Sequence, residues 1–349
     1  MNKIGIVSYG AYLPSKRIKA SLIAAAWQKE NNQIEKSLGV REKTVAGLDE
    51  DSITMAIEAS LIALKRTAIK KTKIKAVFMG SESHPYVINP STTKVAAILG
   101  LGHDYFTADL EFACKAGTAA IQIVTSFLLA KQIDYGLAIG ADKAQGRPSD
   151  SLEYATAAGA VALILGRKKE EFLARIDAFC SFNSDTPDFW RREGAKYPSH
   201  GGRFTGEKAY FHHTLSAGRQ LFQKTKTKAA DYDYAVFHMP NGKFPRKVGK
   251  LLGFSQKQIQ PGLIVESVGN AYSASSLLGL CAVLDQAKPN QKIFLVSYGS
   301  GAGSDAFSLI TTPLLLKKRK QGESFSSFLK KKRYINYVEY LKLTEAINN

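Results

Sequence analysis

Cys114 is the residue whose type and position most directly suggest covalent chemistry. It stands in EFACKAGTAA, at the start of small and apolar residues that predict a buried helix over 116–132. The thiolate is the reactive form of cysteine, and the free N–H groups at a helix start stabilise it and lower the pKa of the thiol. Cys114 is therefore a candidate nucleophile, although a buried inert thiol fits the local sequence equally well. We give that inert role to Cys180 and Cys281, which lie in apolar patterns.

Two further residues end apolar strand patterns and could transfer protons. His238 stands between VF and MPNGK, and a histidine at a strand end is held firmly enough for general acid or base work. Glu82 in GSESHP occupies the matching place earlier in the chain, where burial would raise the pKa of its carboxyl and suit it to proton abstraction. The alternatives are a core histidine bonded to a backbone carbonyl and a solvated loop acid.

Hydrogen-bond donors for a developing negative charge are suggested by two other segments. Asn270 in VGNAYS could offer its side-chain amide to an oxyanion, although an asparagine in this setting also serves as a helix cap or turn residue. The glycines of SYGSGAG, which include Gly299, would let backbone N–H groups approach a reacting carbonyl. Glycine-rich runs are common, so this second signal is weak by itself.

The elements that must position these residues recur along the chain. An offset of 159 residues brings 76–78 (AVF) onto 235–237 (AVF), and both triplets end apolar runs. The same offset brings 137–140 (LAIG) onto 296–299 (VSYG). Because these runs are too continuous for strands with one solvated face, they predict buried sheets in an α/β architecture.

The repeat divides the chain into two similar halves and a tail. We place the first half at 1–166, the second at 167–316 and a basic, tyrosine-rich tail at 317–349. In each half a helix of small residues follows the polar segment, and the offset puts Cys114 near Ser273. Polar clusters that close corresponding strands should meet at one interface between the halves, and we expect the chemistry there.

Composition narrows the function further. The 349 residues carry a formal net charge of +18, and the segment 313–349 holds nine Lys or Arg against three Glu, six of the eighteen charges. We find no stacking aromatics along a basic stripe and no nucleic-acid-binding module, so a solvated cationic face is favoured over nucleic-acid binding. Three cysteines at no metal-ligand spacing argue against a disulfide framework and a zinc site, and predict a cytoplasmic protein. We see no membrane span and no signal peptide.

Taken together, the motifs resemble a known family. EFACKAGTAAIQ, FHMPNGKFP, VGNAYSASS and SYGSGAG are similar to segments of the condensing enzymes of the thiolase superfamily. GSESHPYVINP, GADKAQGRPSDSLEYATAAGA, YPSHGGRFTGEKAYFHHT and the tail narrow the resemblance to hydroxymethylglutaryl-CoA synthases of the archaeal type, over essentially the whole chain. A thiolase that resembled this chain would have a second reactive cysteine at the position of Ser300, so a thiolase is disfavoured. A ketoacyl synthase would have no acid at the position of Glu82, so this residue favours the hydroxymethylglutaryl-CoA synthases.

The resemblance implies a duplicated five-layered α/β/α/β/α sandwich that forms 3-hydroxy-3-methylglutaryl-CoA from acetyl-CoA and acetoacetyl-CoA, a step in isoprenoid precursor supply by the mevalonate pathway. Cys114 would carry the acetyl group, Glu82 would remove a methyl proton, and His238 would polarise and protonate the ketone. Asn270 would orient His238. Backbone N–H groups of Cys114 and of the turn around Ser300 would hold the thioester oxyanion. No metal and no bound cofactor is implied.

The same resemblance implies contacts and partners. Lys243, and Lys247 four residues further along the same helical face, would meet the CoA phosphates, while Ser273, Arg203 and Thr205 are further expected substrate contacts. At least a homodimer is implied, in an assembly with acetoacetyl-CoA thiolase and a bridging protein that has a zinc site and an OB fold. In the tail, Tyr334, Tyr337 and Tyr340 are expected along one side of a helix, which either packs on its own domain or docks those partners. The remaining alternatives are a ketoacyl synthase III-like enzyme for another acyl-CoA and a non-catalytic scaffold.

Overall fold

Nine strands form the framework of the computed structural model, which describes residues 4–301 and 303–347. Within this range they make one mixed sheet in the order β11-β12-β13-β8-β1-β7-β6-β4-β5. The first half supplies β1 (Ile4–Tyr12), β4 (Ile74–Gly80), β5 (Phe106–Leu110), β6 (Tyr135–Lys143) and β7 (Ala158–Gly166). The second half supplies β8 (Ala174–Asn183), β11 (Tyr234–Phe237), β12 (Lys292–Val296) and β13 (Gly303–Thr311).

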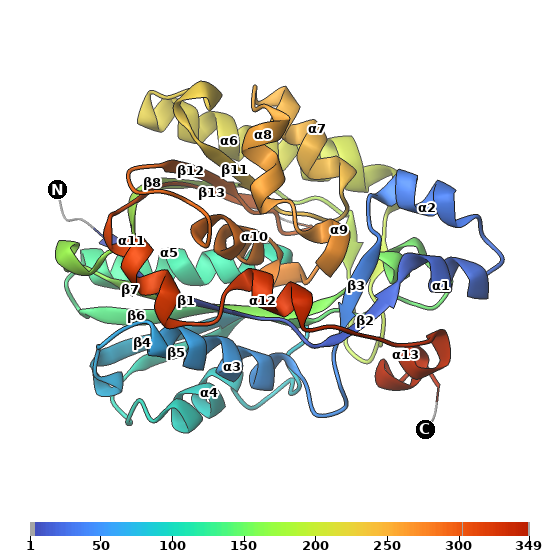
Figure 1. The fold of residues 1–349 in the computed structure, drawn as a ribbon, viewed down its shortest axis with the longest axis horizontal. Helices are drawn as coiled ribbons and strands as arrows, with labels where there is room; N and C mark the ends of the chain where they lie inside the picture. Colours follow the sequence, from blue (N-terminus) through green and yellow to red (C-terminus); the bar gives the residue numbers. More distant parts are fainter. Residues whose placement is uncertain (1–3, 302, 348–349) are drawn as a thin grey trace.

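Helices separate and cover the two parts of this sheet, as Figure 1 shows. The middle layer consists of α5 (Ala116–Leu129) and α10 (Ser275–Leu284). The outer layers are α3 (Ser52–Lys65) and α4 (Ser91–Leu99) on the first-half strands, and α6 (His212–Thr225), α7 (Lys243–Leu251) and α8 (Gln256–Ile259) on the others. The five-layered α/β/α/β/α prediction is confirmed.

The apolar runs explain this layering. Every residue of β7 is buried, and so is every residue of α10, because strands and helices that are covered on all sides need no polar face. A short antiparallel pairing of β1 with β8, Ile4 opposite Ile176, joins the two halves of the sheet.

The predicted repeat corresponds to a repeated strand order. Each half contains three adjacent strands with the same directions. In the first half β4 is parallel to β6, and β6 is antiparallel to β7. In the second half β11 is parallel to β12, and β12 is antiparallel to β13. Phe78 pairs with Ala138, and Phe237 pairs with Val296. Because Ala138 and Val296 differ by 158 and not 159, the prediction that residues 137–140 match 296–299 is wrong by one position.

The tail packs onto the protein itself. Phe325, Phe328, Ile335 and Leu343 are buried, and the short strand β14 (Arg333–Tyr334) pairs with β2 (Lys16–Lys19). The predicted helix carrying three tyrosines is wrong, because Tyr334 lies in β14 and α13 (Tyr337–Leu343) begins only after Asn336, whose side chain caps it.

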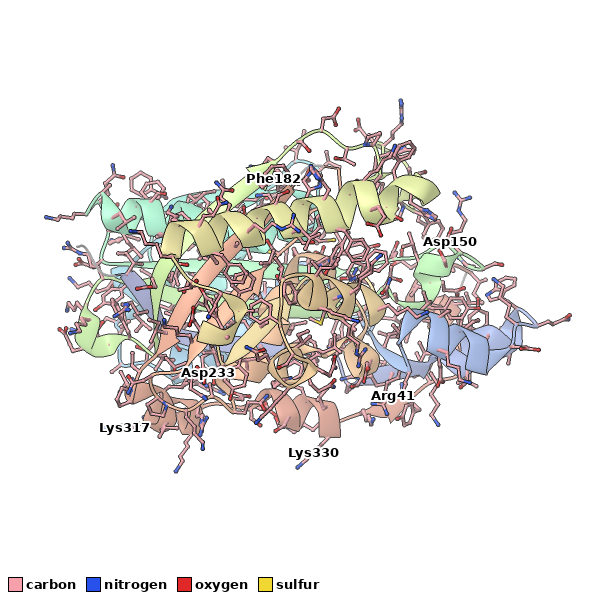
Figure 2. All side chains as sticks on the ribbon, turned by 90° about the horizontal axis from the view of Figure 1, so that it is seen from above. Arg41, Asp150, Phe182, Asp233, Lys317 and Lys330 are labelled. Atoms are coloured by element: carbon pink, nitrogen blue, oxygen red, sulfur yellow. The ribbon has the colours of Figure 1, made fainter. Side chains whose placement is uncertain are left out.

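The remaining elements surround the layers. They are α1 (Ala20–Ala26), α2 (Asn31–Leu38), β3 (Glu42–Val45), β9 (Phe189–Trp190), β10 (Ser199–His200), α9 (Val265–Val268), α11 (Leu314–Lys318) and α12 (Phe325–Lys330), besides short 3-10 turns and a π-helix at Thr205–Phe211 that leads into α6. The labelled Lys317 and Lys330 extend from the outer surface, as expected for a solvated cationic face (Figure 2). Across the described residues, none of the helices combines the length and apolar character needed to cross a membrane.

Candidate active site

Two turns of matching geometry meet between the halves. The turn Ala113–Lys115 precedes α5, and the turn Tyr272–Ala274 precedes α10. Ala113 has a φ of +45° and Tyr272 a φ of +42°, a left-handed backbone that costs a non-glycine residue energy and is retained mainly at functional sites. The turns touch because Gly117 has no Cβ, which would lie 2.7 Å from the Ser273 carbonyl oxygen.

Cys114 lies in the first of these turns and lines a cavity of about 330 Å³. We call it the Cys114 cavity; its walls include Cys114, His238, Asn270, Asp188, Phe189, Tyr210, Phe244, Tyr272, Tyr298 and Ser300. The thiol is 4% exposed, and burial, followed by the nearby Glu82, raises its pKa well above the ordinary value. The predicted lowering of the pKa by a helix start is wrong, because α5 begins two residues later and burial outweighs its field.

Glu82 follows β4 and contacts the thiol. Burial, followed by the charge of Asp142, raises the pKa of Glu82 to about 8, whereas a hydrogen bond with Cys114 opposes the rise. The raised pKa expected from the sequence is confirmed. Glu82 Oε1 is buried and has no hydrogen-bond partner among the described residues, so once the carboxyl is ionised no other donor competes for this oxygen.

Asp142 connects the Glu82 segment after β4 to the turn Tyr272–Ala274, and sequence reasoning missed it. This fully buried carboxylate at the end of β6 accepts hydrogen bonds from Ser81 Oγ at 2.9 Å, Glu82 N at 2.8 Å, Ser83 Oγ at 2.7 Å and Ser273 N at 2.8 Å. It therefore fixes the backbone of Glu82 relative to the second half. The sequence did contain a signal for Asp142, because this acid lies near the end of an otherwise apolar strand.

His238 follows β11 and projects from a fixed backbone. Its N–H donates to the Val296 carbonyl at 2.8 Å, and its carbonyl accepts from the Tyr210 hydroxyl at 2.7 Å. Burial lowers the pKa of His238 to about 3, so the imidazole is neutral at physiological pH. A neutral imidazole can donate an N–H hydrogen bond to a ketone oxygen but cannot deliver a proton as an imidazolium.

Asn270 is held by backbone on both sides. Its N–H donates to the Ala155 carbonyl at 2.6 Å, its carbonyl accepts from Ala157 N at 2.9 Å, and its Oδ1 accepts from Tyr272 N at 3.1 Å. These bonds hold the amide group at the wall of the Cys114 cavity. Within the described residues no hydrogen bond joins Asn270 to His238.

The glycine turn contributes less than predicted. Gly299 N donates to the Gly303 carbonyl at 2.7 Å, and Gly301 N donates to Asp188 Oδ1 at 2.5 Å. The prediction that the Gly299 amide holds an oxyanion is therefore wrong, because its hydrogen is already engaged. Ser300 lies between these residues and lines the cavity.

The expected CoA contacts are divided between the surface and the interior. Lys243 begins α7 and is exposed, whereas Lys247, one turn later on the same face, pairs with Glu207 at 2.5 Å. Thr205 lines the Cys114 cavity. Ser273 does not line it: its buried hydroxyl donates to the Gly80 carbonyl at 2.8 Å, so the predicted substrate contact is wrong there. The side chain of Arg203 lies outside the described residues.

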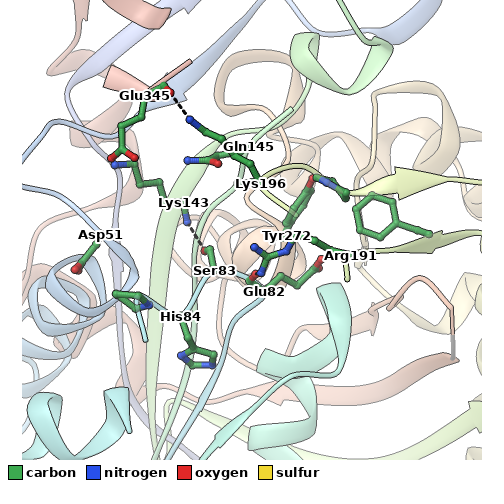
Figure 3. A pocket seen from close by; sticks show the side chains of 14 residues that line it. Asp51, Glu82, Ser83, His84, Lys143, Gln145, Arg191, Lys196, Tyr272 and Glu345 are labelled. Atoms are coloured by element: carbon green, nitrogen blue, oxygen red, sulfur yellow. Dashed lines mark hydrogen bonds between the residues drawn. The ribbon is translucent and has the colours of Figure 1, made fainter. Parts of the chain in front are cut away.

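A second cavity of about 340 Å³ reaches Glu82 from another side. We call it the Glu82 cavity; Glu82, Ser83, His84, Lys143, Arg191, Lys196 and Tyr272 line it, and Figure 3 shows their side chains around it. Phe189 and Tyr272, whose rings meet edge to face at 6.1 Å, line both cavities and so form the wall between them.

The chain is similar to a set of curated proteins over nearly its whole length. It is 53% identical to a hydroxymethylglutaryl-CoA synthase of Archaeoglobus fulgidus over 339 residues, 97% of this chain and 98% of the relative. It is 50% identical to one of Methanopyrus kandleri, over 99% of this chain and 98% of the relative. Residues 222–310 match the family model for the C-terminal part of 3-oxoacyl-[acyl-carrier-protein] synthase III.

Solved structures share the fold. A structure of MvaS in complex with 3-hydroxy-3-methylglutaryl coenzyme A superposes with a TM-score of 0.90 at 21% identity, covering 99% of this chain and 92% of the other. A structure of HMG-CoA synthase complexed with CoA gives a TM-score of 0.88 at 22% identity, covering 97% and 90%. These likenesses establish the thiolase-type architecture.

Proposed function

Because the chain belongs to the hydroxymethylglutaryl-CoA synthase family, we propose how its residues carry out the condensation of acetyl-CoA with acetoacetyl-CoA to 3-hydroxy-3-methylglutaryl-CoA. One observation carries the assignment: the buried Cys114 thiol, which is hydrogen-bonded to the Glu82 carboxyl, lies at the cavity wall that also holds His238 and Asn270. A nucleophile, a base and two hydrogen-bond donors are the groups that this condensation needs.

Acetylation begins with the thiol. Glu82 in its ionised form, which is the minor form below its pKa of about 8, takes the Cys114 proton; the sulfur attacks the acetyl-CoA carbonyl, and the CoA thiolate leaves with that proton. This assignment explains why Glu82 contacts a thiol whose own pKa is high, since the thiolate is the nucleophile and needs a base to form.

Condensation uses the same base a second time. Glu82 removes a proton from the acetyl methyl group, and the enolate carbon attacks the ketone of acetoacetyl-CoA. His238 and Asn270 donate hydrogen bonds to the oxygens that gain charge, and the new alkoxide is protonated from Glu82. Water then cleaves the Cys114 thioester and releases the product with a free carboxylate.

The surroundings of the site support further proposals. Exposed Lys243 follows Asn241 at the wall of the Cys114 cavity and suits the CoA phosphates. All three cysteines are free thiols and form no disulfide, in keeping with a cytoplasmic location.

We place a homodimer contact at the free edge of β5. Val87 and Ile88 are 87% and 90% exposed, and Phe106 on the edge strand is 51% exposed. A second copy could pair with this edge and cover these side chains. Tyr334 and Val338 on the tail, 45% and 58% exposed, form the surface we propose for acetoacetyl-CoA thiolase and the bridging OB-fold protein.

The decisive experiment is an assay of both half-reactions. The wild-type chain should acetylate Cys114 from acetyl-CoA, as seen by mass spectrometry, and should form 3-hydroxy-3-methylglutaryl-CoA when acetoacetyl-CoA is added. Cys114→Ala should lose both, and Cys180→Ala is the matched control. Condensation with a malonyl donor alone would instead support a ketoacyl synthase, which the match at residues 222–310 keeps as the second candidate.

A further inference from the structure

His84 lies beside the proposed base and has no role in the mechanism so far. Its side chain is only 5% exposed and lines the Glu82 cavity (Figure 3). Its Nε2 is buried and has no hydrogen-bond partner among the described residues. Glu82 Oε1 and the Tyr272 hydroxyl, which line the same cavity, share this property. Three unpaired polar groups around one polar cavity are the environment in which buried water is held.

The other ring nitrogen of His84 is held in place. Its Nδ1 lies 2.8 Å from Ser91 Oγ and 3.6 Å from Asp109 Oδ2. Asp109 is itself fixed by the start of α4, where Ser91 N and Thr92 N donate to its two oxygens at 2.6 and 3.0 Å. The carboxylate favours the tautomer that carries hydrogen on Nδ1, which leaves the Nε2 lone pair as a proton acceptor at the cavity wall.

The reaction produces a proton that must leave this buried site. Acetyl-CoA, acetoacetyl-CoA and water give 3-hydroxy-3-methylglutaryl-CoA with an ionised carboxylate, CoA and one proton. Glu82 handles every proton in the proposed mechanism, and the CoA substrates occupy the Cys114 cavity. The Glu82 cavity offers a separate route, because Arg191 and Lys196 at its wall are exposed to solvent.

We propose that His84, oriented by Asp109 and Ser91, is a proton relay that connects Glu82 to solvent through water in the Glu82 cavity. The proton on Glu82 Oε1 passes to a water, which passes a proton to His84 Nε2, and His84 gives a proton to bulk water. No bond to carbon changes in these steps. The inference rests on the function proposed above and adds a residue that acts through Glu82.

Deuterium exchange at the acetyl-enzyme tests this role. Glu82 can remove and return a methyl proton of acetyl-Cys114, and deuterium enters the methyl group only if Glu82 exchanges its proton with D₂O. The acetyl-enzyme is incubated in D₂O with desulfo-CoA to fill the Cys114 cavity, and deuterium in the Cys114 peptide is measured by mass spectrometry.

We expect His84→Gln to acetylate Cys114 at the wild-type rate but to incorporate methyl deuterium at least about tenfold more slowly, since general acid–base groups contribute factors of about 100 or more. His84→Ala should show the same loss and recover with added imidazole, which a purely structural role would not produce. The exposed His103→Gln is the matched control.

Wild-type exchange rates in both His84 variants would overturn the relay while leaving the proposed function intact. So would a loss of exchange in His84→Ala that imidazole does not restore. If His84→Gln does not fold, the imidazole experiment on His84→Ala decides; if neither folds, His84 is structural and the relay is rejected. Absence of Cys114 acetylation in the wild-type chain would instead refute the proposed function itself.

Discussion

Replacing Glu82 with glutamine should stabilise the protein in a way that depends on pH. The fold raises the pKa of this carboxyl from 4.5 to about 8, so between these values the folded state holds a proton that the unfolded state has lost. Stability must therefore fall as pH rises through this window, by about 1.4 kcal/mol per pH unit for one proton, and level off above about 8. The whole difference corresponds to about 5 kcal/mol.

Glutamine has no proton to lose and escapes this penalty. The free energy of unfolding of Glu82→Gln, minus that of the wild type, should therefore rise by about 3 kcal/mol between pH of about 5.5 and about 8.5. Urea denaturation followed by circular dichroism measures both proteins at each pH. Asp104→Asn, whose parent side chain is 93% exposed, is the control and should show no such rise.

A difference that stays constant over this range would show that Glu82 is not strained by its surroundings, and the reasoning from burial and Asp142 would fail. Condensation should be lost in the same variant, because glutamine cannot accept the methyl proton. A variant that is more stable but inactive would show that Glu82 lowers the stability of the fold in order to serve catalysis, a trade that is common at active sites.

Three further predictions concern other parts of the molecule. Lys115 and Asp305 form a buried ion pair 2.9 Å apart, so Lys115→Met or Asp305→Asn alone should cost about 3–5 kcal/mol. Lys115→Met with Asp305→Leu should recover only part of that loss in a thermal double-mutant cycle, because the Thr118 and Ser181 hydroxyls also donate to Asp305 and would lose their acceptor. Phe328→Ala should cost about 3–5 kcal/mol in urea denaturation, but Val338→Ala on the same tail should stay within about 0.5 kcal/mol, because only the first is buried. His238, with a pKa of about 3, should show no titration of its ring nitrogens by NMR between pH of about 5 and 8, and a shift in that range would contradict its neutral role.

The sequence was most informative where a residue's neighbours along the chain determine its position. Glu82 and His238 each follow an apolar strand, and strand ends of the two halves do meet at one site. Asp142 was missed because its partners are up to 131 residues away, and only the folded chain brings Ser273 N to its carboxylate. Local pattern could not reveal that contact.

The errors have a similar origin. The expected effect of a helix start on Cys114 considered one element, whereas the observed pKa reflects burial between two halves and a nearby acid. The glycine run looked free to bind an oxyanion, but Gly299 N closes its own turn with Gly303. Ser273 was expected to contact the substrate, yet its hydroxyl donates to the Gly80 carbonyl, so this turn of the second half serves to hold the first half.

The shared middle layer has a consequence for synthesis on the ribosome. Helix α5 is made early, but one of its sides is covered only by α10 and by strands of the second half (Figure 1). One of these strands is β8, where the Ser181 hydroxyl accepts a hydrogen bond from Gln122 of α5. A nascent chain that ends before β8 therefore carries an apolar helix face with nothing from the second half to cover it, together with the unpaired edge of β1, and until α10 is made this face is only partly covered. Such a chain is open to aggregation and to chaperone binding until at least Leu284 has emerged.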